Sequence, residues 1–161
     1  MTSVTRTGDA PPVPGFIESQ FSPLVKAVVD ECLEHHEVVG ERTGVLLATT
    51  FGDSTTTDTA SRRQLAGQVH NPLLFYQSVP TSILGYVTRE HGITGPICCI
   101  SVFGESQAAE MAQDMLAEGD IDRVLLVEVE LAPTQRVAAA ATGLAVQPPA
   151  EHTATATVVT A

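Results

Sequence analysis

The stretch NPLLFYQSVPTSILGYVTREHGITGPICCISVF, residues 71–103, decides the fold that this sequence predicts. Pro72 and Pro80 limit helix to the part after Pro80, because proline lacks the backbone N–H that a helix interior needs. Beyond Pro80, apolar residues recur at helical spacing as far as Gly92, which is the expected helix end. The apolar run ICCISVF then fits a strand that is buried on both faces. Helix, turn and buried strand in this order favour an α/β protein.

Helix and strand patterns alternate on both sides of this stretch. They favour a mixed, mostly parallel sheet with helices packed on it. The alanine-rich residues 134–146 fit either a helix or a strand. The other expected elements are a helix from Pro23 to about Gly40, a strand at 45–48, a short helix within 59–68, a helix at 105–118, and strands at 123–131 and 153–159.

The first fifteen residues, MTSVTRTGDAPPVPG, differ in composition from the rest. They hold three prolines and two glycines and offer almost nothing to bury. We therefore expect a disordered tail over residues 1–15 and one domain over residues 16–161. With 43% hydrophobic residues, the chain is able to form a core.

Charge excludes several classes of partner. The net charge is −11, and the eight basic residues are scattered, with only Arg62 and Arg63 adjacent. Such a surface repels phosphate, so we expect no nucleic acid and no membrane partner. No apolar run approaches the length of a membrane span, and no leader-like apolar segment stands at the start. These features favour a cytoplasmic protein.

The three cysteines are Cys32, Cys98 and Cys99. Neighbouring residues of a strand point to opposite faces, so a disulfide between Cys98 and Cys99 is not expected. We interpret all three as reduced core thiols. The alternative is that Cys98 and Cys99 form a redox or acyl-accepting pair.

Two polar clusters raise the question of a metal. His35 and His36 are flanked by acidic residues, but adjacent histidines on a helix diverge by about 100°, which favours a solvated helix end. Asp53 and Asp58 enclose a threonine run that fits a capped polar loop better than a cation site. We therefore expect no metal and no cofactor.

Three phrases together resemble the β-ketoacyl synthase family, which has the thiolase fold. The first is NPLLFYQSVPTSILGY, where Thr81 stands at the family's usual Asn. The second is HGITGPICCIS, and the third is AQDMLAEGDIDRVLLVEVE. FSPLVKAVVDECL and GVLLATTFGD resemble the opening of short ketosynthase-like proteins associated with polyene and type II polyketide biosynthesis. The positions that keep the family pattern are Pro72, Phe75, Ser78, Val79, Pro80, Gly85, Gly92, Gly95 and Pro96.

The resemblance implies the N-terminal half of a ketosynthase, with two departures that bear on catalysis. The family's nucleophilic cysteine lies about eight residues past Gly-Pro, which places Gly104 there, followed by Glu105. Neither residue can carry an acyl thioester, and Ser106 comes two positions late. The family's two catalytic histidines belong to the C-terminal half, so His35, His36, His70, His91 and His152 cannot take their roles.

The resemblance also guides which residues to test as a pocket. The pocket candidates are Phe75, Ser78, Phe103 and Glu105. Glu105 fits a helix-start residue, stabilised by the helix dipole, or a spacer or base in the old active site. The family's first strand is missing from the expected elements, and residues 134–146 are a candidate to replace it.

Ketosynthases pair through the strand that precedes the nucleophile. The resemblance therefore implies an interface at Ile97, Cys98, Cys99, Ile100 and Ser101, in a homodimer or in a heteromer with an intact ketosynthase. A half fold is also expected to leave a large apolar face uncovered.

Two functions remain open at this point. The first is a non-catalytic accessory subunit, resembling a chain length factor or a docking subunit, in type II polyketide or fatty-acid-like biosynthesis. An acidic acyl carrier protein would then dock on the partner subunit, because this chain would repel it. The alternative is a small enzyme that acts on carrier-bound acyl chains through Glu105 or a cysteine.

Overall fold

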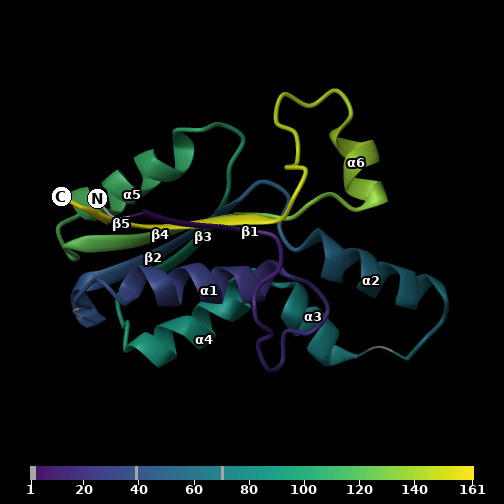
Figure 1. The fold of residues 1–161 in the computed structure, drawn as a ribbon, viewed down its shortest axis with the longest axis horizontal. Coiled ribbons are helices and arrows are strands. Elements are labelled where there is room, and N and C mark those ends of the chain that lie inside the picture. Colours follow the sequence, from purple (N-terminus) through teal and green to yellow (C-terminus); the bar gives the residue numbers. More distant parts are fainter. Residues whose placement is uncertain (1–2, 39, 70) are drawn as a thin grey trace.

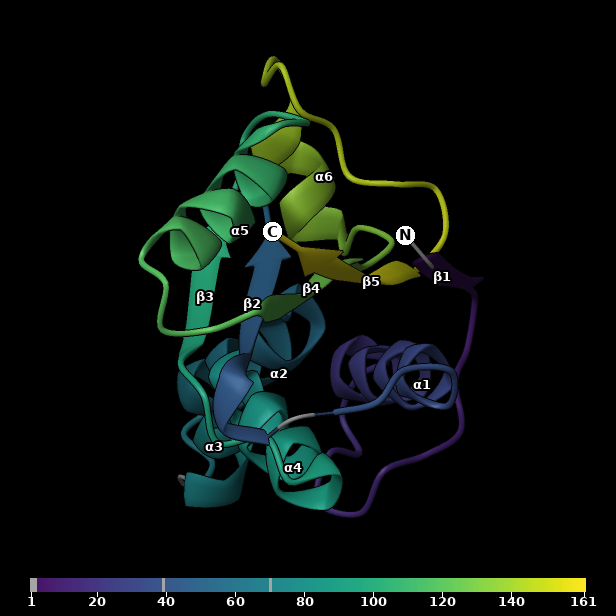
Figure 2. The same cartoon turned by 90° about the vertical axis from the view of Figure 1, so that its left-hand side faces the viewer.

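A five-stranded mixed sheet with helices on both faces forms the body of the protein (Figures 1 and 2). The computed structural model describes residues 3–38, 40–69 and 71–161. The strand order is β1-β5-β4-β2-β3, in which β2 pairs in parallel with β3 and β4, and β5 is antiparallel to β4 and β1. The expected fold class is confirmed. The strands are β1 (Ser3–Thr7), β2 (Thr43–Thr49), β3 (Ile97–Ser101), β4 (Arg123–Glu130) and β5 (Thr153–Thr160).

Helices α1 and α4 cover one face of the sheet and α5 covers the other (Figure 2). Strand β2 is fully buried, with Leu47 in the core under α1 and α4 and Leu46 in the core under α5. This explains why its sequence is a continuous apolar run. The helices are α1 (Phe21–Leu33), α2 (Ser54–Leu65), α3 (Pro72–Ser78), α4 (Thr81–His91), α5 (Gln107–Ala117) and α6 (Gln135–Ala141), and a 3-10 turn spans Gly40–Arg42.

The N-terminal segment is structured from Ser3 onward, so the tail expected over residues 1–15 is wrong for residues 3–15. Strand β1 pairs with β5 and supplies the first strand that the sequence did not reveal. The proline-rich part that follows is held by burial of Val13 and Phe16 and by the Ala10 N–H, which donates to Gln20 Oε1 at 2.8 Å. Three of the five residues of SVTRT, namely Val4, Thr5 and Thr7, are β-branched, which is a strand signal that the neighbouring prolines outweighed. Residues 1 and 2 lie outside the described part of the chain.

Two short helices also correct the expectations. Helix α3 lies before Pro80, where no helix was expected, because Asn71 accepts the Leu73 N–H at 3.0 Å and Pro72 occupies the first turn. Residues 134–146 contain α6 and do not replace a strand. There Thr134 Oγ1 accepts the Val137 N–H at 3.2 Å as the N-terminal cap.

The part of the sheet that α5 leaves open carries hydroxyl groups. On the α5 side of the sheet, β1 presents Ser3, Thr5 and Thr7, and β5 presents Thr153, Thr155 and Thr157, followed by Val159 in the core under α5. Thr5 and Thr155 are hydrogen-bonded through their hydroxyls at 2.9 Å, and Thr157 donates to Ser3 at 3.0 Å. The expected large apolar face is therefore absent from this region of the described chain, because the alternation of β5 turns its alanines inward and its threonines outward.

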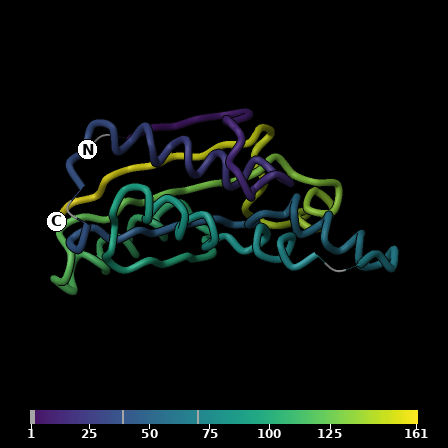
Figure 3. The backbone as a smooth tube through the Cα atoms, turned by 90° about the horizontal axis from the view of Figure 1, so that it is seen from below, coloured from purple at the N-terminus to yellow at the C-terminus, as the bar shows by residue number. Residues whose placement is uncertain are grey.

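Helices α2 and α3 extend past the sheet at the end where β2 has its C-terminus (Figure 3). None of the described helices is long and apolar enough to cross a membrane.

Two glycines of the NPLLFYQSVPTSILGYVTREHGITGP segment allow a stability test. A Cβ on Gly95 would lie 2.2 Å from the Thr43 carbonyl oxygen, where the turn before β3 presses on β2. We expect Gly95→Ala to lower the free energy of unfolding by about 2–4 kcal/mol, because backbone must move. Gly85 lies inside α4 with nothing near its Cβ, so Gly85→Ala should raise stability by about 0.5–1 kcal/mol. Urea titrations would measure both, and equal effects would contradict the packing described.

Candidate functional site

The turn between β3 and α5 lies at the C-terminal ends of the parallel strands, where α/β proteins place their ligands. Backbone and side chains hold this turn. The Val102 N–H donates to the Thr49 carbonyl at 3.2 Å, and Thr50 Oγ1 donates to the Val102 carbonyl at 2.8 Å. The Phe103 N–H donates to Gln107 Oε1 at 2.7 Å, which joins the turn to the first residue of α5. The turn is therefore a defined strand–turn–helix junction.

The residues predicted at the nucleophile position occupy this junction. Gly104 and Glu105 are exposed and precede α5, whose N-cap is Ser106 without a side-chain capping bond. Helix α5 therefore begins at Gln107, two residues after the predicted start at Glu105, and Glu105 lies in the turn before it. The nearest thiols, Cys98 and Cys99, lie back within β3. The junction carries no thiol for acyl transfer.

A cavity of about 590 Å³ opens beside this junction. The sequence-predicted residues Phe103 and Glu105 line it together with Gly104. Phe75 and Ser78 do not; they line a separate hollow of about 400 Å³ between α2 and α3. The structure therefore divides the predicted pocket candidates between two places. The remaining lining of the first cavity is Ala48, Thr50, Val102, Glu128, Val129, Glu130, Ala145, Val146, Thr153 and Thr155.

Two carboxylates in this cavity were missed from the sequence. Glu130 accepts the Phe51 N–H at 3.3 Å and also the Thr50 N–H, so it fixes the loop after β2. Glu128 lines the cavity, and partial burial raises the pKa of its carboxyl group by desolvation. The signal was present in VLLVEVE, where two acids alternate at the end of an otherwise apolar strand. With Glu105, they make this an acidic pocket that disfavours phosphate groups.

Strand β3 is an edge strand, and its outer side has no paired strand in the part of the chain that the structure describes. Its register with β2, together with the bond from the Val45 N–H to the Pro96 carbonyl, turns the backbone groups of Cys98 and Ile100 toward β2. The N–H and C=O groups of Ile97, Cys99 and Ser101 therefore point outward. This is the backbone pattern that another strand can extend.

Cys98 and Cys99 are half-buried, and only Cys32 is fully buried. The expectation that all three are core thiols is wrong for the pair, because β3 has a neighbour on one side only. Burial raises the pKa of the Cys32 and Cys99 thiols, and for Cys99 the neighbouring Cys98 adds to the effect.

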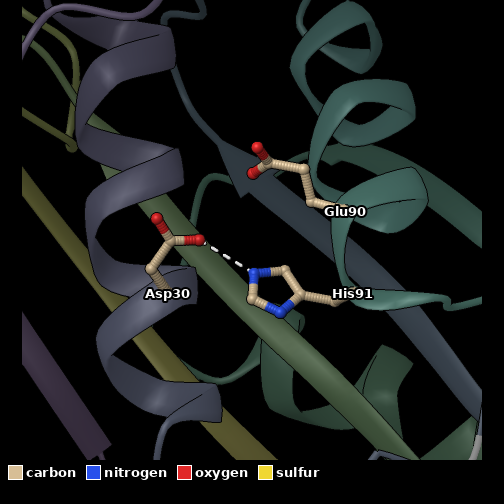
Figure 4. A group of neighbouring side chains, drawn as sticks. All are labelled: Asp30, Glu90 and His91. Atoms are coloured by element: carbon tan, nitrogen blue, oxygen red, sulfur yellow. Dashed lines mark hydrogen bonds and ion pairs between the residues drawn. The ribbon is translucent and has the colours of Figure 1, made fainter.

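A polar cluster joins α1 to α4 (Figure 4). Asp30 Oδ1 lies 2.8 Å from His91 Nε2, and Glu90 lies beside them. The Lys26 ammonium lies 2.5 Å from Asp30 Oδ2 and 2.9 Å from Glu90 Oε2, which is where a cation would bind. We interpret the cluster as an ion-pair clamp between the helices. It was missed because its two halves are some sixty residues apart in the chain.

The other polar candidates have structural roles. Asp53 caps α2, accepting the Thr56 N–H at 3.1 Å and the Thr56 hydroxyl at 2.8 Å, as expected for a capped loop. Its burial raises the pKa of the carboxyl group. His35 is exposed near the end of α1. His70 lies outside the described residues.

Comparison with known proteins agrees with this geometry. No protein-family model matches the chain, and no curated protein sequence matches it. Solved structures do match. A chain of a ketosynthase in complex with its chain length factor, from Xenorhabdus doucetiae, superimposes with a TM-score of 0.75 at 16% identity, covering 94% of this chain and 63% of that chain.

Two further structures show the same fold. The ishigamide ketosynthase/chain length factor has a TM-score of 0.72 at 18% identity, over 92% of this chain and 46% of that chain. A β-ketoacyl synthase from Burkholderia phymatum STM815 has a TM-score of 0.65 at 18% identity, over 96% of this chain and 46% of that chain. The protein thus has a thiolase-type α/β fold. More closely, it has the fold of ketosynthases and chain length factors, and spans less than two thirds of the matched chains.

Thiol chemistry tests the position of the junction. We expect a cysteine introduced by Gly104→Cys to react fastest with iodoacetamide, because the N-terminus of α5 lowers the pKa of a thiol there. Cys98 and Cys99 should react more slowly, and Cys32 only after unfolding. Peptide mapping after timed alkylation would give the order. A Gly104→Cys thiol no faster than Cys99 would show that the junction does not activate a nucleophile.

Proposed function

We propose that this chain is a non-catalytic, ketosynthase-like accessory subunit, of the chain-length-factor or docking type, that pairs with an intact ketosynthase. The observation that carries the proposal is Gly104 at a well-formed strand–turn–helix junction. The scaffold for a nucleophile is present, and the residue at its position has no side chain to acylate. The work of acyl transfer would then fall to the partner, which would also receive the acyl carrier protein.

The open edge of β3 supports the assembly part of the proposal. An unprotected edge strand with neither proline nor charge on it recruits another strand. The interface would therefore consist of the predicted residues Ile97–Ser101, with the outward groups of Ile97, Cys99 and Ser101 making the hydrogen bonds. Exposed Phe103 and Met111 stand at the end of this strand and on α5 and would add apolar contact.

The acidic cavity favours a second candidate, a small enzyme that acts on carrier-bound acyl chains. Glu128 would be its base, because its raised pKa brings the carboxyl group closer to neutral pH. Glu105 is the other group placed for this role. The absence of a nucleophile at Gly104 makes this the weaker candidate.

A condensation assay tests the catalytic part. The purified chain, incubated with acyl and malonyl carrier proteins, should form no ketoacyl product and take up no acyl label. Mass spectrometry of the intact protein and of the released chains gives both readouts. The second candidate, a small enzyme that acts on carrier-bound acyl chains, would be favoured by either of two results. One is an acyl label on any residue, and the other is product formation that Glu128→Gln or Glu105→Gln abolishes.

A proline substitution tests the assembly part. Cys99→Pro removes an N–H that points outward, so the bonds from β3 to β2 survive, whereas Cys98→Pro removes an N–H that β2 uses. We expect Cys99→Pro to stay folded and to lose at least tenfold in affinity for the ketosynthase encoded nearest to its own gene. Cys98→Pro should unfold at a much lower temperature. Full binding by folded Cys99→Pro would contradict docking through β3.

A further inference from the structure

The segment that follows β3 carries acidic side chains and no basic ones. From Phe103 to Asp122 the chain carries no basic residue. Glu105, Glu110, Asp114 and Glu118 are all exposed on α5 or at its ends. Among the described residues, none of these four carboxylates has an ion-pair partner. Several basic residues of the protein are instead engaged elsewhere, as Lys26 is with Asp30 and Glu90, and Arg42 with Asp122.

This charge lies where a partner at β3 would meet it. Helix α5 packs mainly on β4 and β2, so it lies one strand in from the β3 edge and on the side of the sheet away from β1 (Figure 2). It follows β3 directly through the turn at 102–106, and Met111 on its surface is one of the exposed apolar side chains. A strand that extends the sheet at β3 therefore brings whatever element flanks it against the acidic surface of α5.

A second copy of this chain does not fit that description. Antiparallel pairing of two β3 strands about a twofold axis perpendicular to the sheet keeps the same face of both sheets on one side. The α5 helices of both copies would then face one another across the axis. Glu110 and Asp114 would meet an equally acidic surface, and like charges in an interface oppose association.

We propose that the β3 edge and α5 form one docking surface for a partner whose own edge strand is flanked by a basic helix, and that this charge pattern selects a heteromer over a homodimer. The inference rests on the proposed function for the use of β3. It adds the chemistry of the partner: an exposed strand, apolar contacts to Ile97 and Met111, and lysines or arginines opposite Glu110 and Asp114.

A charge-reversed copy of the chain can stand in for such a partner. In Glu110→Arg/Asp114→Arg, the edge strand is unchanged and the α5 surface becomes basic. Arginine is a good helix former, so α5 should persist, which circular dichroism would check. Wild type and variant should each sediment as monomers. Mixed in equal amounts, they should form a 1:1 heterodimer at low salt that weakens at least tenfold on going from ~0.02 M to ~0.5 M NaCl.

Two matched controls are needed. One distinguishes the charge of the α5 surface from the total charge of the protein, and the other tests whether the β3 edge is required as well as α5. Glu31→Arg/Glu34→Arg makes the same change of charge on α1 and at its C-cap, at the opposite face of the sheet, and should form no heterodimer with wild type. Adding Cys99→Pro to either member of the active pair should abolish the heterodimer. Three results would overturn the proposal. They are a wild-type homodimer at low salt, failure of wild type and Glu110→Arg/Asp114→Arg to form a heterodimer when mixed, and equal binding of wild type by the α1 variant. Because the mixture contains only this chain, its result is independent of whether the natural partner is a ketosynthase.

Discussion

The close approach of the turn at Gly95 to the start of β2 is the contact on which the rest of the structure depends. It sets β3 beside β2 in parallel register, with Val45 opposite Ile97, and the Gly40 carbonyl accepts the N–H groups of Thr94 and Gly95 at 2.9 and 3.1 Å. Strand β2 is thereby paired on both sides and buried on both faces. The C-terminal ends of three parallel strands then meet at one edge, which is where the cavity and the β3–α5 junction lie.

That arrangement makes the framework of the junction independent of the side chain at position 104. The backbone of the junction is held by Thr50 and Gln107, and neither contact depends on the residue at position 104. A Cβ at position 104 would meet only the Gln107 side chain, at 3.8 and 3.9 Å, so the turn can hold glycine or a larger residue there at little structural cost. The same cavity gains Glu128 and Glu130 from β4, so its floor is acidic.

Most of the framework could be predicted from the sequence, because buried strands and amphipathic helices leave strong periodic signals. The run ICCISVF and the α4 stripe are examples. Strand β1 was missed because its partner β5 is distant in the chain and its own five residues expose alternate side chains. Helix α3 depends on a cap from Asn71, which outweighs the prolines around it. The half-burial of Cys98 and Cys99 required the strand order, since an apolar run cannot show that it lies at an edge. The grouping of Glu105 with Glu128, and of Asp30 with His91, required the tertiary fold.

Pairing of β1 with β5 has a consequence for how the chain folds. The register joins Ser3 to Thr157, so the first strand made is completed by the last strand described. Strand β5 lies between β1 and β4. Until β5 is available, β1 has no strand to pair with, and the edge of β4 that faces away from β2 stays unpaired. Closing so long a loop is slow, since contacts distant in sequence must be made against a large loss of chain entropy. During synthesis, β1 therefore has no strand to pair with until the ribosome has released the segment that forms β5.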